Sequence, residues 1–256
     1  MVIKRSLDLI LCLTALLALL PMFLIIVLVL RLTGEREVFF RQRRIGYGNR
    51  SFELWKFVTM LKDSPKTGTI TAANDPRILP VGRFLRKTKI NELPQLINVL
   101  KGDMSIVGPR PLTEETFSLY PEEFKALIYC SRPGMTGIGS LVFRNEEDIL
   151  ARSPKDRYRC YREDIAPLKG ELEAWYYVNR SLVVDLKIIV FTVVAILSPG
   201  NQLYRRWFRE LPTEAREANG APPRRATLES NAASHLLGQP RESVEKTTHV
   251  GEIGKG

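Results

Sequence analysis

The hydrophobic pattern begins with a long apolar run. Residues 9–30 (LILCLTALLALLPMFLIIVLVL) carry no charge and are numerous enough for a helix to cross a bilayer. Pro21 stands near the middle of the run, where it removes a helix hydrogen bond and predicts a kink. The run is long for a cleaved signal peptide, and no small-residue cleavage site follows it. The pattern therefore predicts a retained membrane segment over residues 1–34.

Basic residues flank the run on both sides, with Lys4 and Arg5 before it and several arginines after it (Arg31, Arg36, Arg41, Arg43 and Arg44). Positive charge stays on the cytoplasmic side, so both ends are expected in the cytoplasm. A re-entrant helix that enters, bends at Pro21 and returns satisfies the charges and the proline. A straight span with a cytoplasmic C-terminal domain is the alternative.

Shorter patterns follow over residues 35–200, where we expect a catalytic domain. Apolar and polar residues alternate in EVFFRQRRIG and SFELWKFVTM around the turn GYGNR, which predicts a hairpin. Turn formers over 64–80, and again in GDMSIVGPRP and SRPGMTGIGS, predict loops. LYPEEFKALIYC predicts a short helix, and residues 146–170 are expected to be partly helical. An apolar helix is expected over 176–197, packed in the core or lying at the membrane surface.

The segment 91–101 has the strongest helix pattern of the domain. Asn91 is expected to cap its start, Pro94 is tolerated in its first turn, and Gly102 follows as a stop. Residues 201–256 have few apolar positions and are expected to be a largely disordered tail. The elements together predict a mixed α/β fold dominated by helices, with short strands, interfacial amphipathic helices and an N-terminal membrane anchor.

Charge narrows the class of partner. The 256 residues carry a formal net charge of +10, which points to nucleic acid, an anionic membrane or phosphorylated small molecules. A nucleic-acid binder is expected to interleave aromatic residues with its cations, whereas here the cations gather at a helix start and at Pro-rich loops. Nucleic acid is therefore not an expected partner. The three cysteines are dispersed, which argues against a disulfide framework or a zinc site and suits a reducing compartment.

The start of the segment 91–101 is the candidate chemical site. Free N–H groups at a helix start bind phosphate, and four cations precede it (Arg83, Arg86, Lys87 and Lys89). Arg110 stands between two prolines, which stiffen the backbone that presents its guanidinium. Glu92 is a candidate ligand for Mg²⁺, which prefers oxygen atoms and substrate phosphates. The pattern indicates a diphosphate site; a capped amphipathic helix behind a solvated basic loop is the alternative.

Several motifs resemble the bacterial sugar transferase family, the monotopic polyprenyl-phosphate phosphoglycosyl transferases. They are KRSLDLIL, VFFRQRRIGYG, KFVTM, RPGMTG and the most specific block, Asp75 to Pro111 (DPRILPVGRFLRKTKINELPQLINVLKGDMSIVGPRP). The resemblance runs from about Lys4 to about Leu197. It implies a re-entrant helix broken at a proline, although Leu20 stands where the family often has Ser. It also implies Mg²⁺ and transfer of a sugar 1-phosphate from a nucleotide sugar, such as a UDP-sugar, to a polyprenyl phosphate.

The resemblance also assigns residues by position. The family's catalytic pair is Asp-Glu, so Glu92 is implied as catalytic and metal-binding, while Arg86, Arg110 and Arg144 are implied as phosphate-binding. Asn91 stands where the nucleophilic Asp is expected, and a neutral amide is a far weaker nucleophile than a carboxylate. Three explanations follow: an inactive chain, attack by another carboxylate such as Glu92, or direct transfer between substrates. Three acidic residues beyond Arg144 are further candidate carboxylates (Glu146, Glu147 and Asp148).

The sequence therefore predicts a phosphoglycosyl transferase at the cytoplasmic face of a bacterial inner membrane. Its expected partners are a nucleotide sugar, undecaprenyl-type phosphate, membrane lipids and downstream glycosyltransferases, in the assembly of exopolysaccharide, capsule or O-antigen. A catalytically inactive relative that serves as a membrane-bound scaffold is the alternative function, because of Asn91.

Overall fold

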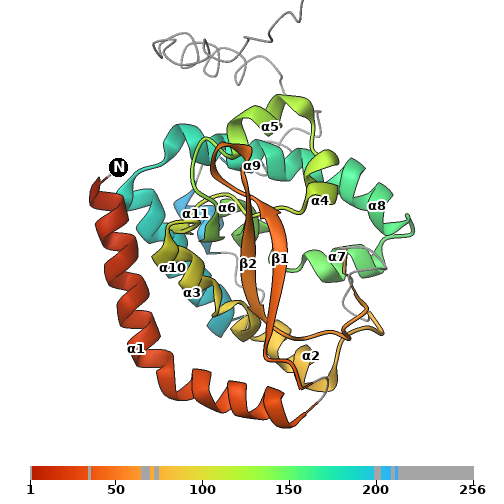
Figure 1. Cartoon of the computed structure of the whole chain (residues 1–256). Coiled ribbons are helices and arrows are strands. Elements are labelled where there is room, and N and C mark those ends of the chain that lie inside the picture. Colours follow the sequence, from red (N-terminus) through yellow and green to blue (C-terminus); the bar gives the residue numbers. More distant parts are fainter. Residues whose placement is uncertain are drawn as a thin grey trace, which may run out of the picture. The chain divides into compact units, whose positions relative to one another are not determined.

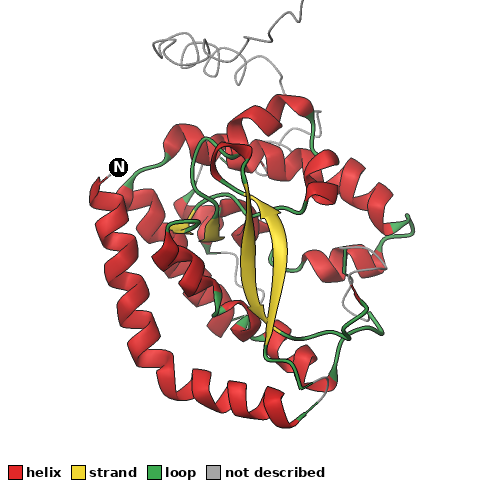
Figure 2. Ribbon diagram, in the orientation of Figure 1, coloured by secondary structure: helices red, strands yellow, loops and turns green. Residues whose placement is uncertain are grey.

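Helices dominate the structure, a computed structural model that describes residues 2–33, 36–64, 70–71, 75–198, 203–208 and 211–212. Figures 1 and 2 show the helices arranged around two small sheets. This confirms the prediction of a helix-dominated mixed α/β fold with an N-terminal apolar helix. Most of the predicted tail lies outside the described residues, and the predicted domain boundaries stay predictions.

Helix α1 (Val2–Leu32) is the one helix in the described part of the chain that is long and apolar enough to cross a membrane. Pro21 lies inside it. In Figure 1 its ribbon first runs beside α3 (Gln95–Lys101) and then turns toward α2 (Pro80–Lys87). Cys12 packs in a cluster with Leu96, and Ile26 packs in another with Leu85. Both halves of α1 therefore rest on the same folded body.

Polar side chains fix the start of α1 to that body. Arg5 donates hydrogen bonds from Nη1 and Nη2 to the carbonyl oxygens of Val99 and Leu100, at 2.7 and 3.0 Å. These carbonyls belong to the last turn of α3, and that of Val99 also accepts from the Gly102 N–H at 3.1 Å. The buried carboxylate of Asp8 accepts a 2.8 Å hydrogen bond from the Ser105 hydroxyl. The first turns of the apolar helix are therefore held at defined places on the body.

The predicted hairpin is confirmed. Strands β1 (Phe39–Ile45) and β2 (Ser51–Phe57) pair antiparallel, and a 3₁₀ turn (Tyr47–Asn49) connects them. Gly48 in this turn has φ +62°, a left-handed conformation that glycine adopts without steric cost. Because side chains alternate along a strand, Gln42 and Arg44 share one face of the hairpin with Lys56. That face is turned toward the cavity described below.

Two segments predicted as loops contain strands instead. β3 (Ser105–Val107) pairs in parallel with β4 (Gly134–Thr136). A Cβ atom at Gly108 would lie 2.3 Å from the Arg132 carbonyl oxygen, and one at Gly134 would lie 2.1 Å from the Gly108 nitrogen. The glycines that suggested loops therefore allow two backbones to approach closely. Strands of three residues are also too short to show a periodic pattern.

The remaining helices lie in the second half of the chain. The predicted short helix corresponds to α5, and the partly helical stretch 146–170 contains α7, α8, a π-helical turn and the start of α9, so both predictions are confirmed. The bounds are α4 (Glu114–Ser118), α5 (Glu122–Ile128), α6 (Ile138–Val142), α7 (Glu146–Arg152), α8 (Arg157–Cys160), the π-helical turn (Tyr161–Ile165), α9 (Ala166–Asn179), α10 (Leu182–Leu197) and α11 (Tyr204–Trp207).

The single helix predicted over 176–197 is wrong, because α9 ends at Asn179 and α10 begins at Leu182. Ser181 caps α10 by accepting a hydrogen bond from the backbone N–H of Val184. The polar residues around 180 therefore end α9 and begin a separate helix. Ile188 of α10 then packs with Leu172 of α9 in a cluster that also buries residues of the described C-terminal part (Tyr204, Phe208 and Leu211).

Helix α9 buries a carboxyl group in the middle of the body. Glu173 is 5% exposed, and a Cβ at Gly139 would lie 2.5 Å from its Oε1 atom. Burial raises the pKa of Glu173 to about 8, against the opposing effects of Lys169 and of the backbone N–H of Arg110. The Glu173 carboxyl therefore stays protonated in the folded protein up to a pH at which the same carboxyl is ionised in the unfolded chain.

Stability is expected to fall as pH rises from about 4.5 to about 8, because the unfolded chain binds fewer protons than the folded one in that window. Glu173→Gln removes this charge. We expect the variant to be more stable than the native protein at pH 8, by up to about 4 kcal/mol, and nearly equal to it at pH 4. Urea unfolding of detergent-solubilised protein at both pH values measures this. Glu123→Gln, on the exposed face of α5, is the control; an equal effect of Glu173→Gln at both pH values would contradict the prediction.

Candidate active site

A cavity of about 650 Å³ lies among the hairpin, α2, α7, α10 and the segments around residues 91 and 110. Of the residues that line it, nine are Lys or Arg and four are Glu (Arg44, Lys56, Lys62, Arg77, Arg86, Lys89, Arg110, Arg144 and Lys169, with Glu37, Glu92, Glu146 and Glu147). Positive charge exceeds negative charge in a partly enclosed space, where fields are weakly screened. The cavity is therefore suited to an anionic ligand.

The chain enters this cavity through a 3₁₀ turn (Ile90–Glu92), and the predicted helix start at Asn91 is wrong. Helix α3 begins at Gln95, and the Asn91 side chain caps neither element. Pro94 has no N–H to donate to an α-helical hydrogen bond. The preceding turn is therefore closed by 3₁₀ hydrogen bonds between residues three apart, such as that from the Leu93 N–H to the Ile90 carbonyl at 3.1 Å. The predicted stop at Gly102 is confirmed by its φ of +91°.

This turn also changes how a phosphate would be held. The backbone N–H of Glu92 donates to the Lys89 carbonyl at 3.1 Å, and the backbone N–H of Leu93 donates to the Ile90 carbonyl. These N–H groups already have partners inside the turn, contrary to the free helix start that the sequence predicts. Side chains, rather than this backbone, are therefore the candidate donors to a ligand.

Glu92 is the carboxylate at the centre of the cations. Its side chain is 14% exposed, and its Oε1 atom lies 3.6 Å from Arg110 Nη2 and 3.8 Å from Lys56 Nζ. Burial alone would raise the pKa of Glu92, but Lys56, Arg110 and Lys89 outweigh burial and hold that pKa well below its usual range. Glu92 is therefore ionised at neutral pH.

The cations around Glu92 are not fully neutralised. Burial, together with the neighbouring Arg44 and Arg110, lowers the pKa of Lys56 to about 7, against the attraction of Glu92. Burial and Arg110 likewise lower the pKa of Arg44 to about 10. One carboxylate among several buried cations leaves an excess of positive charge, which a bound anion would relieve.

Arg110 is presented by a fixed backbone. The Tyr129 hydroxyl donates to the Arg110 carbonyl at 3.1 Å and accepts from the Leu112 N–H at 2.8 Å. Arg44 donates from Nη1 to the Pro111 carbonyl at 3.1 Å. With a proline on either side, the guanidinium therefore starts from a backbone that has little freedom to move.

The acidic residues of α7 fold back onto the cavity. Glu147 pairs with Arg86 of α2, and Glu146 pairs with Lys169 of α9. Glu146 and Glu147 line the cavity, whereas Asp148, the third carboxylate proposed from the sequence, is not among the described lining residues. Two of the three candidate carboxylates therefore lie where a ligand would meet them.

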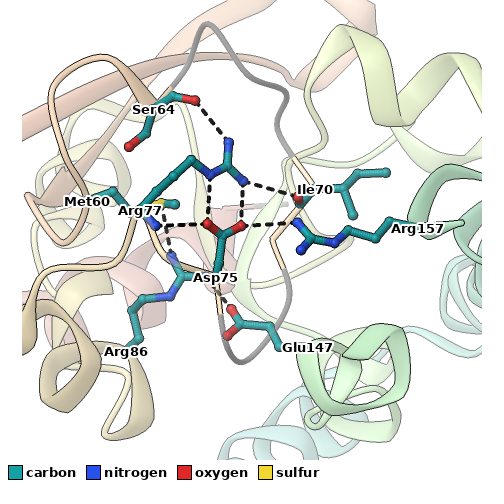
Figure 3. A network of polar contacts seen from close by, with 8 residues as sticks. All are labelled: Met60, Ser64, Ile70, Asp75, Arg77, Arg86, Glu147 and Arg157. Carbon is teal, nitrogen blue, oxygen red and sulfur yellow. Dashed lines mark hydrogen bonds and ion pairs between the residues drawn. The ribbon is translucent and has the colours of Figure 1, made fainter. Parts of the chain in front are cut away.

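A second polar network centres on Asp75 (Figure 3), close to the described residues Ile70 and Arg77 that line the cavity. Asp75 accepts from Arg77 Nε at 2.8 Å and from Arg77 Nη2 at 2.7 Å, and it accepts from Arg157 Nη1 at 3.2 Å. Figure 3 shows Arg77 and Arg157 reaching Asp75 from opposite sides, with Arg86 and Glu147 nearby. The hydrogen bond from Arg77 is the main reason that the pKa of Asp75 is lowered to about 2. Asp75 therefore connects Arg157 of α8 to Arg77.

The structure brings the five residues to which the resemblance assigns a place in the site to one cavity (Asn91, Glu92, Arg86, Arg110 and Arg144), whereas the candidates Arg83, Lys87 and Asp148 are not among its described lining residues. Their individual roles stay predictions. Sequence reasoning missed Lys56, whose signal is a lysine inside the apolar strand segment LWKF. It also missed Lys169 and Tyr161, because nothing in a charged helical stretch distinguishes the residues that turn inward.

Asn91 needs a partner that the described residues do not supply. It is 5% exposed and lines the cavity, and its Oδ1 atom has no hydrogen-bond partner among the described residues. A buried acceptor without a partner is uncommon in folded proteins and costs free energy. The amide is thus placed where a ligand can donate to it.

Comparison with known proteins agrees with this geometry. Residues 1–199 match the family described as bacterial sugar transferase. Exopolysaccharide production protein ExoY of Rhizobium meliloti (strain 1021) is 34% identical over 216 residues, covering 77% of this chain and 87% of that protein. Exopolysaccharide production protein PSS of Rhizobium leguminosarum bv. phaseoli is 37% identical over 212 residues, covering 78% and 98%.

A longer relative shares part of its length with this chain. UDP-glucose:undecaprenyl-phosphate glucose-1-phosphate transferase of Escherichia coli (strain K12) is 35% identical over 199 residues, which cover 75% of this chain and 39% of that protein. The family match extends over more than half of the chain and contains every residue of the candidate site. The chain therefore belongs to the bacterial sugar transferase family.

Proposed function

We propose that this protein transfers a sugar 1-phosphate from a UDP-sugar to a polyprenyl phosphate at a membrane. The observation that carries the proposal is the cluster of incompletely neutralised cations around Glu92 in a cavity large enough for a nucleotide sugar. A diphosphate supplies the negative charge that these cations lack. The name of the relative from Escherichia coli supports a UDP-sugar donor and an undecaprenyl-phosphate acceptor.

The chemistry is displacement at the phosphorus that carries the sugar. An oxygen nucleophile attacks that phosphorus, the bond to the bridging oxygen breaks, and UMP leaves with that oxygen. Arg110, Lys56 and Lys89 are placed to bind the phosphate oxygens, on which negative charge increases in the transition state. Arg86 and Arg144 line the same cavity and are assigned to the remaining phosphate oxygens.

Asn91 leaves two sources for the nucleophile. The ionised Glu92 attacks and carries the sugar phosphate until the acceptor phosphate displaces it, or the acceptor phosphate attacks the donor directly. In both cases the atoms balance, because the sugar phosphate joins the lipid phosphate and UMP is released. The two routes differ in one observable: only the first attaches the sugar phosphate to the protein.

Mg²⁺ is the proposed cofactor, with Glu92 as its protein ligand. The described residues contain no group of three or more Asp, Glu, His or Cys side chains that could hold a metal by themselves. This donor set fits Mg²⁺, which binds through one or two carboxylates together with substrate phosphates and water. When bound, the ion would neutralise phosphate charge.

The anchor is proposed to be re-entrant, with a kink at Pro21. Along α1 an exposed apolar stripe repeats at helical spacing (Ile10, Leu13, Leu17, Leu20, Leu24 and Leu28). Both halves of α1 pack on one body, which a straight crossing of the bilayer would not allow. The exposed apolar residues of α10 provide a second surface for the membrane interface.

Location and pathway complete the proposal. The basic residues at both ends of α1 support a catalytic domain on the cytoplasmic side of a bacterial inner membrane. The relatives named for exopolysaccharide production support a product that enters exopolysaccharide, capsule or O-antigen assembly, where downstream glycosyltransferases would extend it.

Purified protein is expected to release UMP from a UDP-sugar in the presence of polyprenyl phosphate and Mg²⁺. Glu92→Gln is expected to reduce that rate by about 100-fold or more, because the ionised oxygen is lost. Glu53→Gln, an exposed residue of β2 that pairs with Arg41, is the matched control and is expected to keep the native rate. No UMP release by the native protein would favour the scaffold function instead. Full activity of Glu92→Gln would remove Glu92 from the reaction.

Intact-mass measurement of the native protein with donor alone reports whether a sugar phosphate becomes attached.

Arg110→Lys is expected to lower the rate of UMP release by about 100-fold, since a lysine ammonium cannot form the two parallel hydrogen bonds of a guanidinium. The control is Arg83→Lys, on the exposed side of α2 and outside the lining of the cavity. Equal rates for the Arg110→Lys and Arg83→Lys variants would count against phosphate binding by Arg110.

The re-entrant anchor predicts that both ends of α1 are accessible from one side of the membrane. Single cysteines at Ile3 and Thr33, in vesicles of known orientation, are labelled with an impermeant thiol reagent and read by peptide mass spectrometry. The native exposed Cys130 marks the side of the catalytic domain. Labelling of all three positions from one side is expected. Ile3 and Thr33 on opposite sides would establish a straight span.

A further inference from the structure

Helix α10 has three faces with different surroundings. Ile188, Phe191 and Ala195 point into the core. A second face is apolar and exposed, and it includes Leu186 and Val190. The third face is made by Ile189, Thr192, Val193 and Ile196, which all line the cavity. Their spacing of three, four and seven residues is that of one continuous helix face.

This cavity face is apolar in spite of its threonine. The Thr192 hydroxyl lies 2.7 Å from the Thr136 hydroxyl and donates to the Ile188 carbonyl at 2.7 Å. The polar atoms of both threonines therefore have partners on the protein, and the wall presents methyl groups to a ligand. Val193 is 50% exposed, which shows that no described side chain covers it fully.

Other apolar residues of the same cavity continue this wall. Leu96 of α3, Ile106 of β3 and Met135 of β4 line the cavity and pack together in one cluster. From Ile106 the chain reaches Arg110 within four residues, so the apolar wall leads directly to the cations. One continuous cavity therefore combines a cationic end with an apolar wall.

We propose that the cavity face of α10, together with Leu96 and Met135, binds the first isoprene units of the acceptor lipid while its phosphate reaches Arg110. An amphiphile with an anionic head and an apolar chain matches both parts of the cavity, whereas a nucleotide sugar has no apolar chain to place there. The exposed apolar face of α10 adjoins this wall on the same helix, so a chain that leaves the cavity passes to a surface suited to the membrane interface. The inference rests on the proposed function, because it assigns a binding site to the acceptor lipid of that reaction.

Val193 and Val190 offer a matched pair for the test. Both are valines of α10 and both are 50% exposed, but only Val193 lines the cavity. Val193→Trp and Val190→Trp are compared with a UDP-sugar donor and prenyl phosphates of two chain lengths, with two and with eleven isoprene units. We expect Val193→Trp to raise the KM for the long acceptor roughly tenfold or more. For Val190→Trp we expect no change beyond about twofold in any KM.

The selectivity of the effect distinguishes a tail site from general damage. Under the proposal, the KM of Val193→Trp for the UDP-sugar stays within about twofold of the native value, and its KM for the short acceptor rises less than that for the long one. Equal behaviour of the two tryptophan variants would overturn the proposal. An equal loss for the donor and both acceptors would also overturn it.

A binding measurement keeps this test independent of turnover. A prenyl phosphate with a diazirine on its second isoprene unit is photolysed with the native protein, and the labelled peptides are identified by mass spectrometry. Label on residues 189–196 supports the proposal, and competition by unlabelled prenyl phosphate is required. Label confined to α1, or label that inorganic phosphate removes as well as the lipid does, contradicts it. If no UMP is released but α10 is labelled, the proposed function fails and the tail site stands.

Discussion

The site depends on one electrostatic constraint, the burial of the Glu92 carboxylate among cations that it only partly neutralises. Taking a carboxylate out of water is unfavourable unless positive charge surrounds it, and Lys56 and Arg110 provide that charge at 3.8 and 3.6 Å. The same low exposure makes the cations costly, as the lowered pKa of Lys56 shows. The cavity therefore holds an excess of positive charge, which a further anion would reduce. A diphosphate is such an anion, which is why the electrostatics and the family lead to the same class of substrate.

The apolar helix α1 and the segment that presents Arg110 to the cavity are linked by short polar contacts. Lys4, at the start of α1, pairs with Asp185 of α10 and donates to the Val107 carbonyl at 3.1 Å. Tyr176 also donates to Asp185, at 2.7 Å. Val107 ends β3, and Arg110 follows three residues later. The placement of Arg110 therefore depends on residues of α1 and α10, so the position of these helices and that of the Arg110 guanidinium are set together.

Local patterns predicted the parts of the fold that local physics determines. The hairpin follows from alternation and a glycine turn, and the apolar helix follows from its uncharged run. The pairing of β3 with β4 joins segments about thirty residues apart, and only close backbone approach at Gly108 and Gly134 reveals it. The site residues near position 91 were found through composition and resemblance. Lys56 was not, because its role depends on which face of the hairpin turns toward the cavity.

Asn91 determines how this chain departs from the pattern that its motifs resemble. Asn and Asp have nearly the same shape, so the amide leaves the size of the cavity unchanged and removes one negative charge beside Glu92. With an Asp-Glu pair, two carboxylates would lie among these cations, whereas with Asn91 only Glu92 does. The excess of positive charge available to the substrate phosphates is therefore larger. At the same time position 91 no longer supplies an ionised oxygen. We infer that the substitution favours tighter binding of anionic groups and moves the nucleophile to Glu92 or to the acceptor phosphate. In either case the Oδ1 of Asn91, which has no hydrogen-bond partner among the described residues, stays available to a donor group of a ligand.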